Sequence, residues 1–195
     1  MGCRTDAEVA RHRCRWSRSL GCRGSCGWRR LPVVGLSRRC LSRLTTALSF
    51  PVQGKVADFA GLASDHDAVI VAVGNGELRE RLLGQVRLAG LAPVTVIHPS
   101  AVVSPTAVIG AGSTIMAGAV IGTEARLGEG VIVNCGAVID HHCRVGDFGH
   151  LGVGAVMAGG AFLGEGAWMQ ANASLGYGLV IERGRVLAPG EAVSR

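Results

Sequence analysis

Aliphatic residues recur at every sixth position over the second half of the chain. From Val96 the sequence divides without an insertion into sixteen hexads, VIHPSA VVSPTA VIGAGS TIMAGA VIGTEA RLGEGV IVNCGA VIDHHC RVGDFG HLGVGA VMAGGA FLGEGA WMQANA SLGYGL VIERGR VLAPGE. The second residue is Ile, Val, Leu or Met in all sixteen, and the sixth is Ala, Ser, Gly or Cys in twelve. Neither the helical period of 3.6 nor the strand period of 2 keeps an aliphatic in register at six. The pattern therefore predicts a coiled β-solenoid.

Each hexad is expected to supply one short strand and one turn, and three hexads complete a triangular coil. The second residue then fills the interior, and the small sixth residue fits a tight corner. The last three hexads place Leu179, Arg185 and Glu191 at that sixth position. Larger and polar residues there are typical of a terminal, capping coil.

Ahead of the repeat, the hydrophobic pattern changes to that of a βα unit. It predicts a buried strand over 68–73, a turn at Gly74-Asn75-Gly76, and an amphipathic helix from about Glu77 to Ala89 that ends at Gly90. A strand running into His98-Pro99 follows. Taken alone, the glycine pair is more typical of an ordinary strand-to-helix turn than of a ligand-binding loop.

The net charge of +6 is concentrated at the N-terminus. Residues 1–43 hold eleven arginines against Asp6 and Glu8, whereas the remaining residues are mildly acidic. This distribution argues against nucleic-acid binding by the main body of the chain. Aromatic residues make up only 4% of the chain and glycine accounts for 30 residues, which favours a narrow, aliphatic, turn-rich fold.

Cysteine is also concentrated at the N-terminus, where five of the seven residues lie without a zinc-type spacing. Cys135 and Cys143 are predicted to be small packing residues rather than a disulfide, so we expect a reducing compartment, the cytoplasm. The sequence contains no uninterrupted run of 18 apolar residues that would predict a membrane span.

Three of the six histidines lie in one stretch, VIDHHCRVGDFGH, residues 138–150. Because Ile139 is the inward residue of its hexad, His141 and His142 fall on an outward corner, and His150 opens a later hexad. A metal site, a general base and a solvated corner are the three interpretations. The solenoid carbonic anhydrases, which this region resembles only in its repeat, hold zinc with histidines that include a pair four residues apart, and the spacing here differs. We therefore predict no metal.

The repeat resembles the hexapeptide-repeat acyltransferases, whose fold is a left-handed parallel β-helix that assembles as a trimer. Within that group, IDHHCRVGDFGHLGVGA is similar to the signature of the NeuD-type sialic acid O-acetyltransferases, which include enzymes that acetylate UDP-4-amino-sugars. The resemblance implies a small Rossmann-like domain before the β-helix, acetyl-CoA as co-substrate, and a sugar or nucleotide-sugar acceptor. It also covers the V-G-x-x-x-x-R and I-H-P-S-A segments that precede and open the repeat.

The resemblance also assigns site residues. His141 matches the catalytic base, His150 a residue near acetyl-CoA, and Asn134 an asparagine close to the base. Imidazole suits a base that deprotonates a sugar hydroxyl or amine near neutral pH. The family has Asp or Glu directly after the base, where this chain has His142, so Asp140 or Asp147 is expected to orient His141 instead.

Glycine-rich turns have backbone N–H groups that can stabilise the oxyanion of the tetrahedral intermediate. We assign two of these turn glycines, Gly152 and Gly159, to the acetyl-CoA side of the site. The Gly74-Asn75-Gly76 turn is assigned to the nucleotide of the sugar, as the resemblance implies.

Three segments result: an irregular Arg/Cys-rich segment over 1–45, a partial Rossmann-like βαβ domain over 46–95, and the β-helix acyltransferase domain over 96–195. The first segment departs from the family, which begins with a strand and a glycine-rich loop. A transit peptide fits its composition, and an incorrect reading frame or start, with family-like sequence resuming near Phe50, is the interpretation we favour. LPVVGL, residues 31–36, is expected to be a surviving strand.

The sequence thus predicts an acetyl-CoA-dependent sugar O- or N-acetyltransferase that is a cytoplasmic homotrimer without a membrane or nucleic-acid partner. The alternative is a degenerate solenoid that assembles without catalysing a reaction. His141 with a usable carboxylate would favour the first, whereas the divergent N-terminus and the short C-terminus favour the second.

Overall fold

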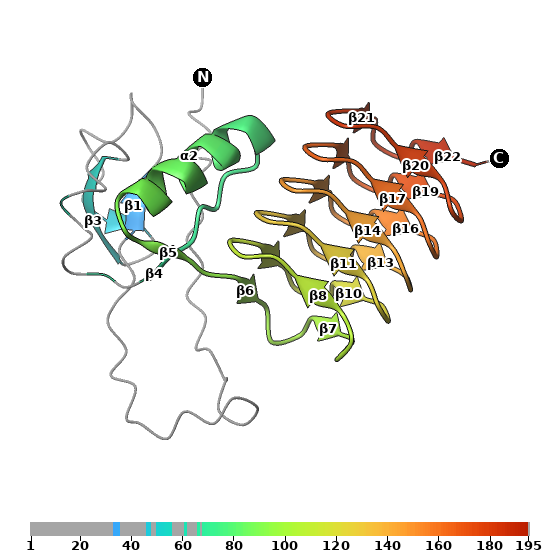
Figure 1. The fold of residues 1–195 in the computed structure, drawn as a ribbon, viewed down its shortest axis with the longest axis horizontal. Coiled ribbons are helices and arrows are strands. Elements are labelled where there is room, and N and C mark those ends of the chain that lie inside the picture. Colours follow the sequence, from blue (N-terminus) through green and yellow to red (C-terminus); the bar gives the residue numbers. More distant parts are fainter. Residues whose placement is uncertain are drawn as a thin grey trace.

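The fold was obtained as a computed structural model that describes residues 68–194 and, ahead of them, Gly61, His66 and the backbone of three short strands (Figure 1). These strands, β1 (Val33–Gly35), β2 (Thr46–Ala47) and β3 (Phe50–Lys55), form a sheet in the order β1-β3-β2. β1 is the strand predicted within LPVVGL, and β3 begins at Phe50. The other residues of 1–67 lie outside the described residues, so the three-segment division and the complete Rossmann-like domain stay predictions.

A βαβ unit precedes the repeat, as predicted. β4 (Ala68–Val69) pairs in parallel with β5 (Ala92–Pro93), and α2 (Gly76–Leu88) connects them. The paired strand is shorter than the predicted 68–73, and a hydrogen bond from Val94 N to Val69 O at 2.9 Å follows the pair. Among the described residues, no helix has the length and apolar character needed to cross a membrane.

Local sequence explains where α2 begins and ends. The Asn75 side chain accepts a hydrogen bond from Leu78 N at 2.8 Å, which satisfies one of the free N–H groups of the first turn. At the other end Gly90 takes a φ of +79°, a left-handed conformation that glycine adopts without strain. Leu82, Leu83 and Val86 lie on the buried face of the helix.

The repeat forms a parallel β-solenoid of about five coils, which confirms the predicted fold class. Each strand is two residues long and pairs with the strand 18 residues further on, as Val120 pairs with Val138. One sheet contains β6 (Val96–Ile97), β9 (Thr114–Ile115), β12 (Ile132–Val133), β15 (His150–Leu151), β18 (Trp168–Met169) and β21 (Val186–Leu187). The second contains β7 (Val102–Val103), β10 (Val120–Ile121), β13 (Val138–Ile139), β16 (Val156–Met157), β19 (Ser174–Leu175) and β22 (Ala192–Val193). The third contains β8 (Val108–Ile109), β11 (Arg126–Leu127), β14 (Arg144–Val145), β17 (Phe162–Leu163) and β20 (Val180–Ile181).

The second residue of each hexad fills the interior. From Ile115 to Leu187 all of these aliphatics are buried, and they form one continuous core with the small residues of the sixth position. Cys143 is one of these small residues, and both Cys135 and Cys143 are free, as expected. In the last coil Arg185 pairs with Glu191 at 3.4 Å. The aliphatic column therefore stabilises the solenoid by burial, as the period of six predicted.

The corners of the coils lie at the fourth and fifth positions of the hexads. The fifth residue commonly has a positive φ, and glycine occupies most of these sites. Glu124, His142, Phe148 and Asn172 are the non-glycine residues with a positive φ among the described residues. Such a conformation is uncommon for a residue with a side chain. Glu124 and His142 lie 18 residues apart, one above the other on the same corner.

Candidate active site

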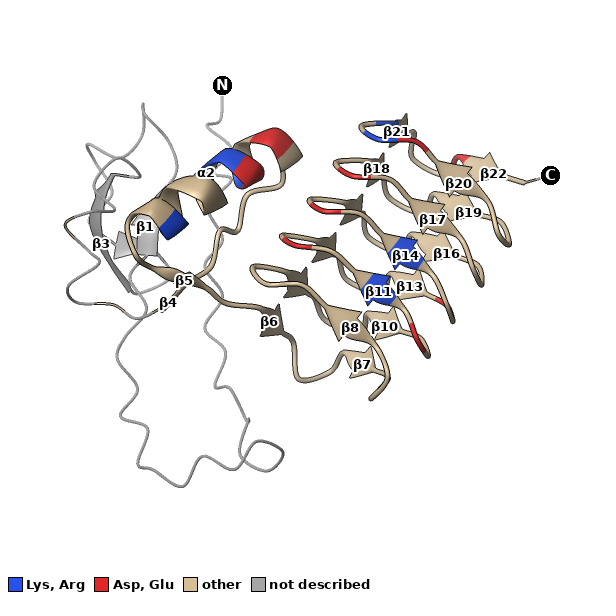
Figure 2. Ribbon diagram, in the orientation of Figure 1, with Lys and Arg blue, Asp and Glu red and all other residues tan. Residues whose placement is uncertain are grey.

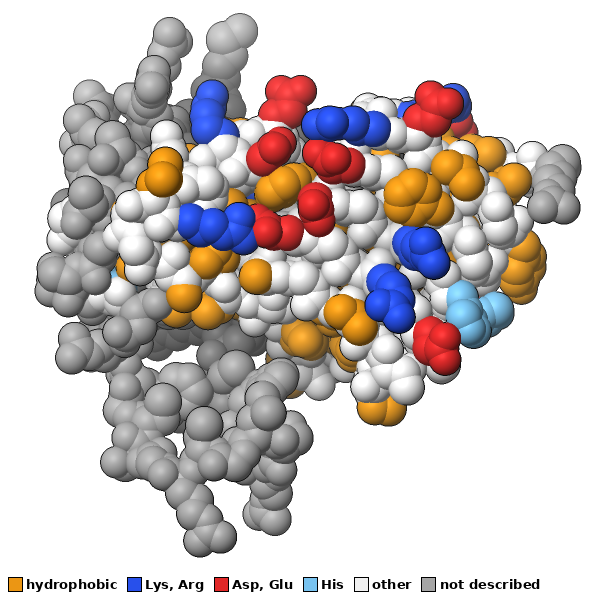
Figure 3. Space-filling model, in the orientation of Figure 1, with side chains coloured by type: hydrophobic (Ala, Val, Ile, Leu, Met, Phe, Trp, Pro, Cys, Tyr) orange, Lys and Arg blue, Asp and Glu red, His pale blue; other side chains and the backbone are white. Residues whose placement is uncertain are grey.

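The predicted base lies on an exposed corner that follows β13. Ile139 anchors this hexad in the core, and the next three residues, Asp140, His141 and His142, turn outward. The side chains of His141 and His142 are 53% and 59% exposed. Figure 3 shows these histidines, in pale blue, on the outer surface of the solenoid beside acidic and basic side chains. The register deduced from the repeat thus gave the correct orientation of the corner.

His141 contacts polar groups on both sides of its ring. Its Nδ1 lies 3.0 Å from Nδ1 of His142, within hydrogen-bond distance. Asp140 accepts a hydrogen bond from the backbone N–H of His141 through Oδ1 at 2.7 Å, and its Oδ2 lies 3.8 Å from Nε2 of His141. The second distance is too long for a hydrogen bond. The structure therefore brings Asp140 to His141, chiefly as a partner of its backbone.

Glu124 is a residue of this corner that sequence reasoning missed. Its Oε2 lies 3.1 Å from Nε2 of His142, one coil away. The signal was available, because an 18-residue coil stacks Glu124 directly against His142. The predicted partners, Asp140 and Asp147, lie near His141 in the sequence, whereas Glu124 lies near it only through the stacking of coils.

Gly159 belongs to the same corner, one coil further on, and makes room for the base. A Cβ at this position would lie 2.5 Å from Cε1 and 2.6 Å from Nε2 of His141. The imidazole edge that carries Nε2 therefore packs directly over the backbone of Gly159. Gly159 was predicted on the acetyl-CoA side of the site, and its geometry ties it first to the histidine ring.

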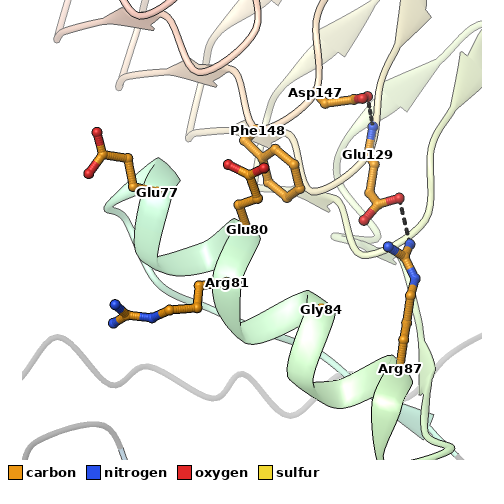
Figure 4. Close-up of a pocket in the computed structure, with 8 residues that line it drawn as sticks. All are labelled: Glu77, Glu80, Arg81, Gly84, Arg87, Glu129, Asp147 and Phe148. Atoms are coloured by element: carbon orange, nitrogen blue, oxygen red, sulfur yellow. Dashed lines mark hydrogen bonds and ion pairs between the residues drawn. The ribbon is translucent and has the colours of Figure 1, made fainter.

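Asp147 lies on a different corner and does not contact His141. Its Oδ1 accepts a hydrogen bond from Glu129 N at 2.8 Å. Figure 4 shows Asp147 and Glu129 facing α2 across a groove of about 590 Å³, with Arg87 forming an ion pair with Glu129 at 2.5 Å. Asp147 thus links two adjacent coils of the solenoid, and Glu129 makes the contact to α2.

His150 lies on a third side of the solenoid, at the start of β15. Its ring stacks on Trp168, with ring centroids 5.3 Å apart. Burial and, to a smaller extent, the nearby Arg79 guanidinium lower the pKa of His150 to about 4, and the backbone of Gly74 acts in the opposite direction. Its buried Nδ1 has no hydrogen-bond partner among the described residues. The imidazole is therefore neutral at physiological pH, and its Nδ1 is shielded from solvent.

Asn134 and Gly152 stack on the corner that follows the β15 sheet. Asn134 Oδ1 accepts from Cys135 N at 2.9 Å, which leaves its amide nitrogen for another partner. Gly152 has a structural reason to be glycine, because a Cβ there would lie 2.8 Å from backbone atoms of Gln170 and Ala171 in the next coil. Neither residue touches His141 in the contacts within this chain.

The predicted turn at Gly74-Asn75-Gly76 is held against the solenoid by Arg79, the arginine of the V-G-x-x-x-x-R segment, to which the sequence assigned no role. Arg79 is fully buried and donates from Nη1 to Val73 O at 2.6 Å and to Gly74 O at 3.1 Å. Burial lowers the pKa of Arg79 to about 10.

The same guanidinium reaches two corners of the solenoid, where Nε donates to Gly130 O and Nη2 to Phe148 O, each at 2.6 Å. Arg79 lies on the apolar stripe of α2 with Leu82, Leu83 and Val86, and a charge on such a stripe was the available signal. The side-chain oxygen of Asn75 is occupied by the hydrogen bond that caps α2.

The charges around the His141 corner are mixed. Arg126 and Arg144 open β11 and β14 and lie side by side on the adjacent face, as Figure 2 shows. Among the residues from 68 to 194, no three His, Cys, Asp or Glu side chains are grouped so that they could hold a metal ion. The corner can therefore offer an imidazole base and positive charge to a substrate.

Two groups of solved structures resemble this chain. An asparagine variant of a histidine of perosamine N-acetyltransferase from Caulobacter crescentus, in complex with CoA and GDP-perosamine, is 35% identical, with a TM-score of 0.77 over 79% of this chain and 74% of that one. The acetyltransferase domain of PglB from Neisseria gonorrhoeae, in complex with acetyl coenzyme A, is 32% identical, with a TM-score of 0.64 over 83% and 80%. No family model and no curated protein matches the chain.

Proposed function

The chain belongs to the hexapeptide-repeat sugar N-acetyltransferases, and we propose that it transfers the acetyl group of acetyl-CoA to the amino group of a nucleotide-linked sugar. The observation that carries the proposal is the His141 corner, where an exposed imidazole is held by polar neighbours and its Nε2 lies beyond hydrogen-bond distance of Asp140. A ring nitrogen that is positioned and unengaged within this corner suits a general base.

The proposed reaction is attack of the sugar amine on the thioester carbonyl carbon. His141 Nε2 removes a proton from the amine as the C–N bond forms, and the carbonyl oxygen becomes an oxyanion. A backbone N–H of a corner donates to that oxyanion. Collapse of the intermediate breaks the C–S bond, and the proton held by His141 passes to the departing thiolate, which leaves as CoA.

We propose that a neighbouring copy completes the site, in a homotrimer. His141 lies on the corner after β13, whereas His150 and the Gly74 turn lie on the β15 side of the same solenoid. A site that uses both histidines therefore needs the β15 side of one copy to face the His141 corner of another. His150 then contributes to the acetyl-CoA side of the site, together with Asn134.

Arg126 and Arg144 support the proposed substrates, because acetyl-CoA and a nucleotide sugar both carry phosphates. Two arginines paired across neighbouring strands, on the face adjacent to the His141 corner, attract anionic groups to this face. The turn at 74–76 is proposed to approach the nucleotide of the sugar. Soluble acetyl-CoA and nucleotide sugars place the proposed reaction in the cytoplasm.

An amino sugar is favoured as acceptor because the solved structures that resemble the chain at 30% identity or more are N-acetyltransferases or acetyltransferase domains. O-acetylation of a sialic acid, which the NeuD-type signature implies, is the second candidate. The two differ at the acceptor atom, and the same base serves both.

A thiol-release assay tests the proposal. The purified protein is incubated with acetyl-CoA and, in separate reactions, a GDP-linked 4-amino sugar, a UDP-linked 4-amino sugar and a free sialic acid. We expect CoA release with an amino sugar, loss of release in His141→Ala, and a trimer by light scattering. Release with the sialic acid alone would overturn the N-acetyl assignment, and no release with any acceptor would overturn the function. An active monomer would overturn the shared site.

A further inference from the structure

The corner that carries His141 contains a chain of three side chains that begins at a carboxylate. Glu124 Oε2 lies 3.1 Å from His142 Nε2, and His142 Nδ1 lies 3.0 Å from His141 Nδ1. The two imidazole rings meet edge to face, with centroids 5.2 Å apart and an interplanar angle of 84°. Glu124 thus reaches His141 through the ring of His142.

The backbone at both linking residues is unusual. Glu124 and His142 have φ values of +54° and +59° at fifth positions of their hexads, where glycine is the common residue. A left-handed conformation costs energy for a residue with a Cβ, and such residues persist where the side chain has a use. Their stacking 18 residues apart brings the carboxylate and the imidazole together on adjacent coils.

The direction of the hydrogen bonds assigns the proton on each ring. A carboxylate only accepts, so His142 donates to Glu124 through Nε2–H. In a neutral ring, His142 Nδ1 is then an acceptor, and the bond between the rings requires His141 to donate through Nδ1–H. His141 consequently keeps its proton on Nδ1, and the lone pair of Nε2 is free to act as the base.

We infer that Glu124 and His142 are positioning residues that hold His141 in the tautomer and orientation required for proton abstraction at Nε2. The inference rests on the proposed function of His141. When Nε2 takes the substrate proton, the positive charge on His141 strengthens its donation to His142, and the Glu124 carboxylate compensates that charge through the second ring. Because Glu124 and His142 are 58% and 59% exposed, water weakens the effect, and we expect a loss of about tenfold in kcat without the pair.

Asp140 is the competing partner, and the geometry separates the two. Asp140 bonds the backbone N–H of His141, and its second oxygen lies 3.8 Å from Nε2, on the side of the ring where the proton arrives. It can therefore stabilise the charged ring, but it does not select the tautomer.

The first test reads the tautomers directly and does not depend on activity. Two-dimensional ¹H–¹⁵N spectra of the protein with ¹⁵N-labelled histidine distinguish a proton on Nδ1 from one on Nε2. We expect His141 with the proton on Nδ1 and His142 with the proton on Nε2, and a loss of this single-tautomer state for His141 in Glu124→Gly, which removes the acceptor. The opposite tautomer at either ring, or an unchanged His141 in the variant, would overturn the inference even if no acceptor is ever turned over.

The second test is a kinetic cycle with the acceptor on which the unaltered protein is active. Glu124→Gln should lower kcat about tenfold and leave KM for acetyl-CoA within about twofold. His142→Asp places a carboxylate directly beside His141, at a backbone conformation that Asp tolerates. In that background Glu124→Gln should cost less than about twofold, because Glu124 no longer acts through a second ring.

A matched control is Glu165→Gln, which removes another carboxylate that pairs with a residue 18 positions away, Arg183, at 2.9 Å on a different corner. It should leave kcat unchanged. An equal loss from Glu124→Gln in both backgrounds would show a role in holding the coils together and would overturn the inference. Full activity of Glu124→Gln alone would also overturn it. Inactivity of the unaltered protein would instead refute the proposed function, with the tautomers still decided by the spectra.

Discussion

A methyl group added at Gly159 should displace the ring of the proposed base, His141, without disturbing the fold. Gly159→Ala introduces a Cβ that would lie 2.5 Å from Cε1 and 2.6 Å from Nε2 of His141. Gly159 is not among the residues with a positive φ, so alanine brings no backbone strain. His141 is a half-exposed side chain, and its ring is free to move away.

The size of the effect follows from the contact distances. Carbon atoms in contact lie about 3.5 Å apart, so the ring must shift by roughly 1 Å. A misplacement of about 1 Å at a catalytic group can cost on the order of 10²-fold in rate. We therefore expect kcat of Gly159→Ala to fall about 100-fold, with KM for acetyl-CoA little changed. If Gly159 served acetyl-CoA alone, as its sequence assignment implies, KM would rise and kcat would stay.

The assay is thiol release under saturating and limiting acetyl-CoA, together with thermal unfolding. Gly164→Ala is the matched control, because its Cβ would meet backbone atoms of the next coil, 2.6 Å from Arg183 N and 2.7 Å from Glu182 C, that cannot move aside. That control should lower Tm by roughly 3–10 °C, whereas Gly159→Ala should keep Tm within about 2 °C. An unchanged kcat in Gly159→Ala would refute the packing of His141 against this glycine.

Three further predictions concern single residues. His141→Ala should lower kcat by about 10²–10⁴-fold with an unchanged Tm, because the side chain is half exposed, and near-normal thiol release would remove its role as base. Arg79→Met should lower the free energy of unfolding in denaturant by about 3 kcal/mol, because it leaves buried carbonyls without donors. The control Arg81→Met, on the exposed side of α2, should change that free energy by less than about 0.5 kcal/mol. Equal effects of the two variants would contradict the role of Arg79 in holding α2 to the solenoid. His150 has a pKa of about 4 in the folded chain and an ordinary value near 6.5 when unfolded, so the unfolded state binds the proton first as the pH falls. The stability that the neutral His150 ring contributes is complete above pH 6.5 and is lost between pH 6.5 and 4, by at most about 3 kcal/mol. The free energy of unfolding of His150→Phe should not show this loss over the same pH range. Identical pH profiles of the two proteins would contradict the burial of His150.

The site could be predicted from the sequence only in part, and particular residues show why. The register of the repeat correctly predicted that His141 and His142 point outward, because the inward position of Ile139 fixes the orientation of the remaining residues in its hexad. The same register also stacks Glu124 on His142 and Gly159 on His141. The residues of each pair are 18 positions apart, and this spacing of one full coil predicts that they stack on each other. Asp147 is close to His141 in the sequence, which favoured it as a partner, but it lies on the next corner of the coil and does not contact His141.

The period of six by itself determined the solenoid, since only a coil with one aliphatic per side packs sixteen such residues into one column. Asn75 and Gly90 likewise determined the ends of α2, because capping depends on the residue and its immediate backbone. Only the tertiary structure decided that Arg79 is buried between the helix and two corners 51 and 69 residues away. It also decided the ring contacts of His141 and the 3.1 Å pairing of Glu124 with His142. A repeat specifies the path of its backbone through burial, whereas the docking of a neighbouring unit and the rotamers of exposed side chains depend on contacts that no local pattern encodes.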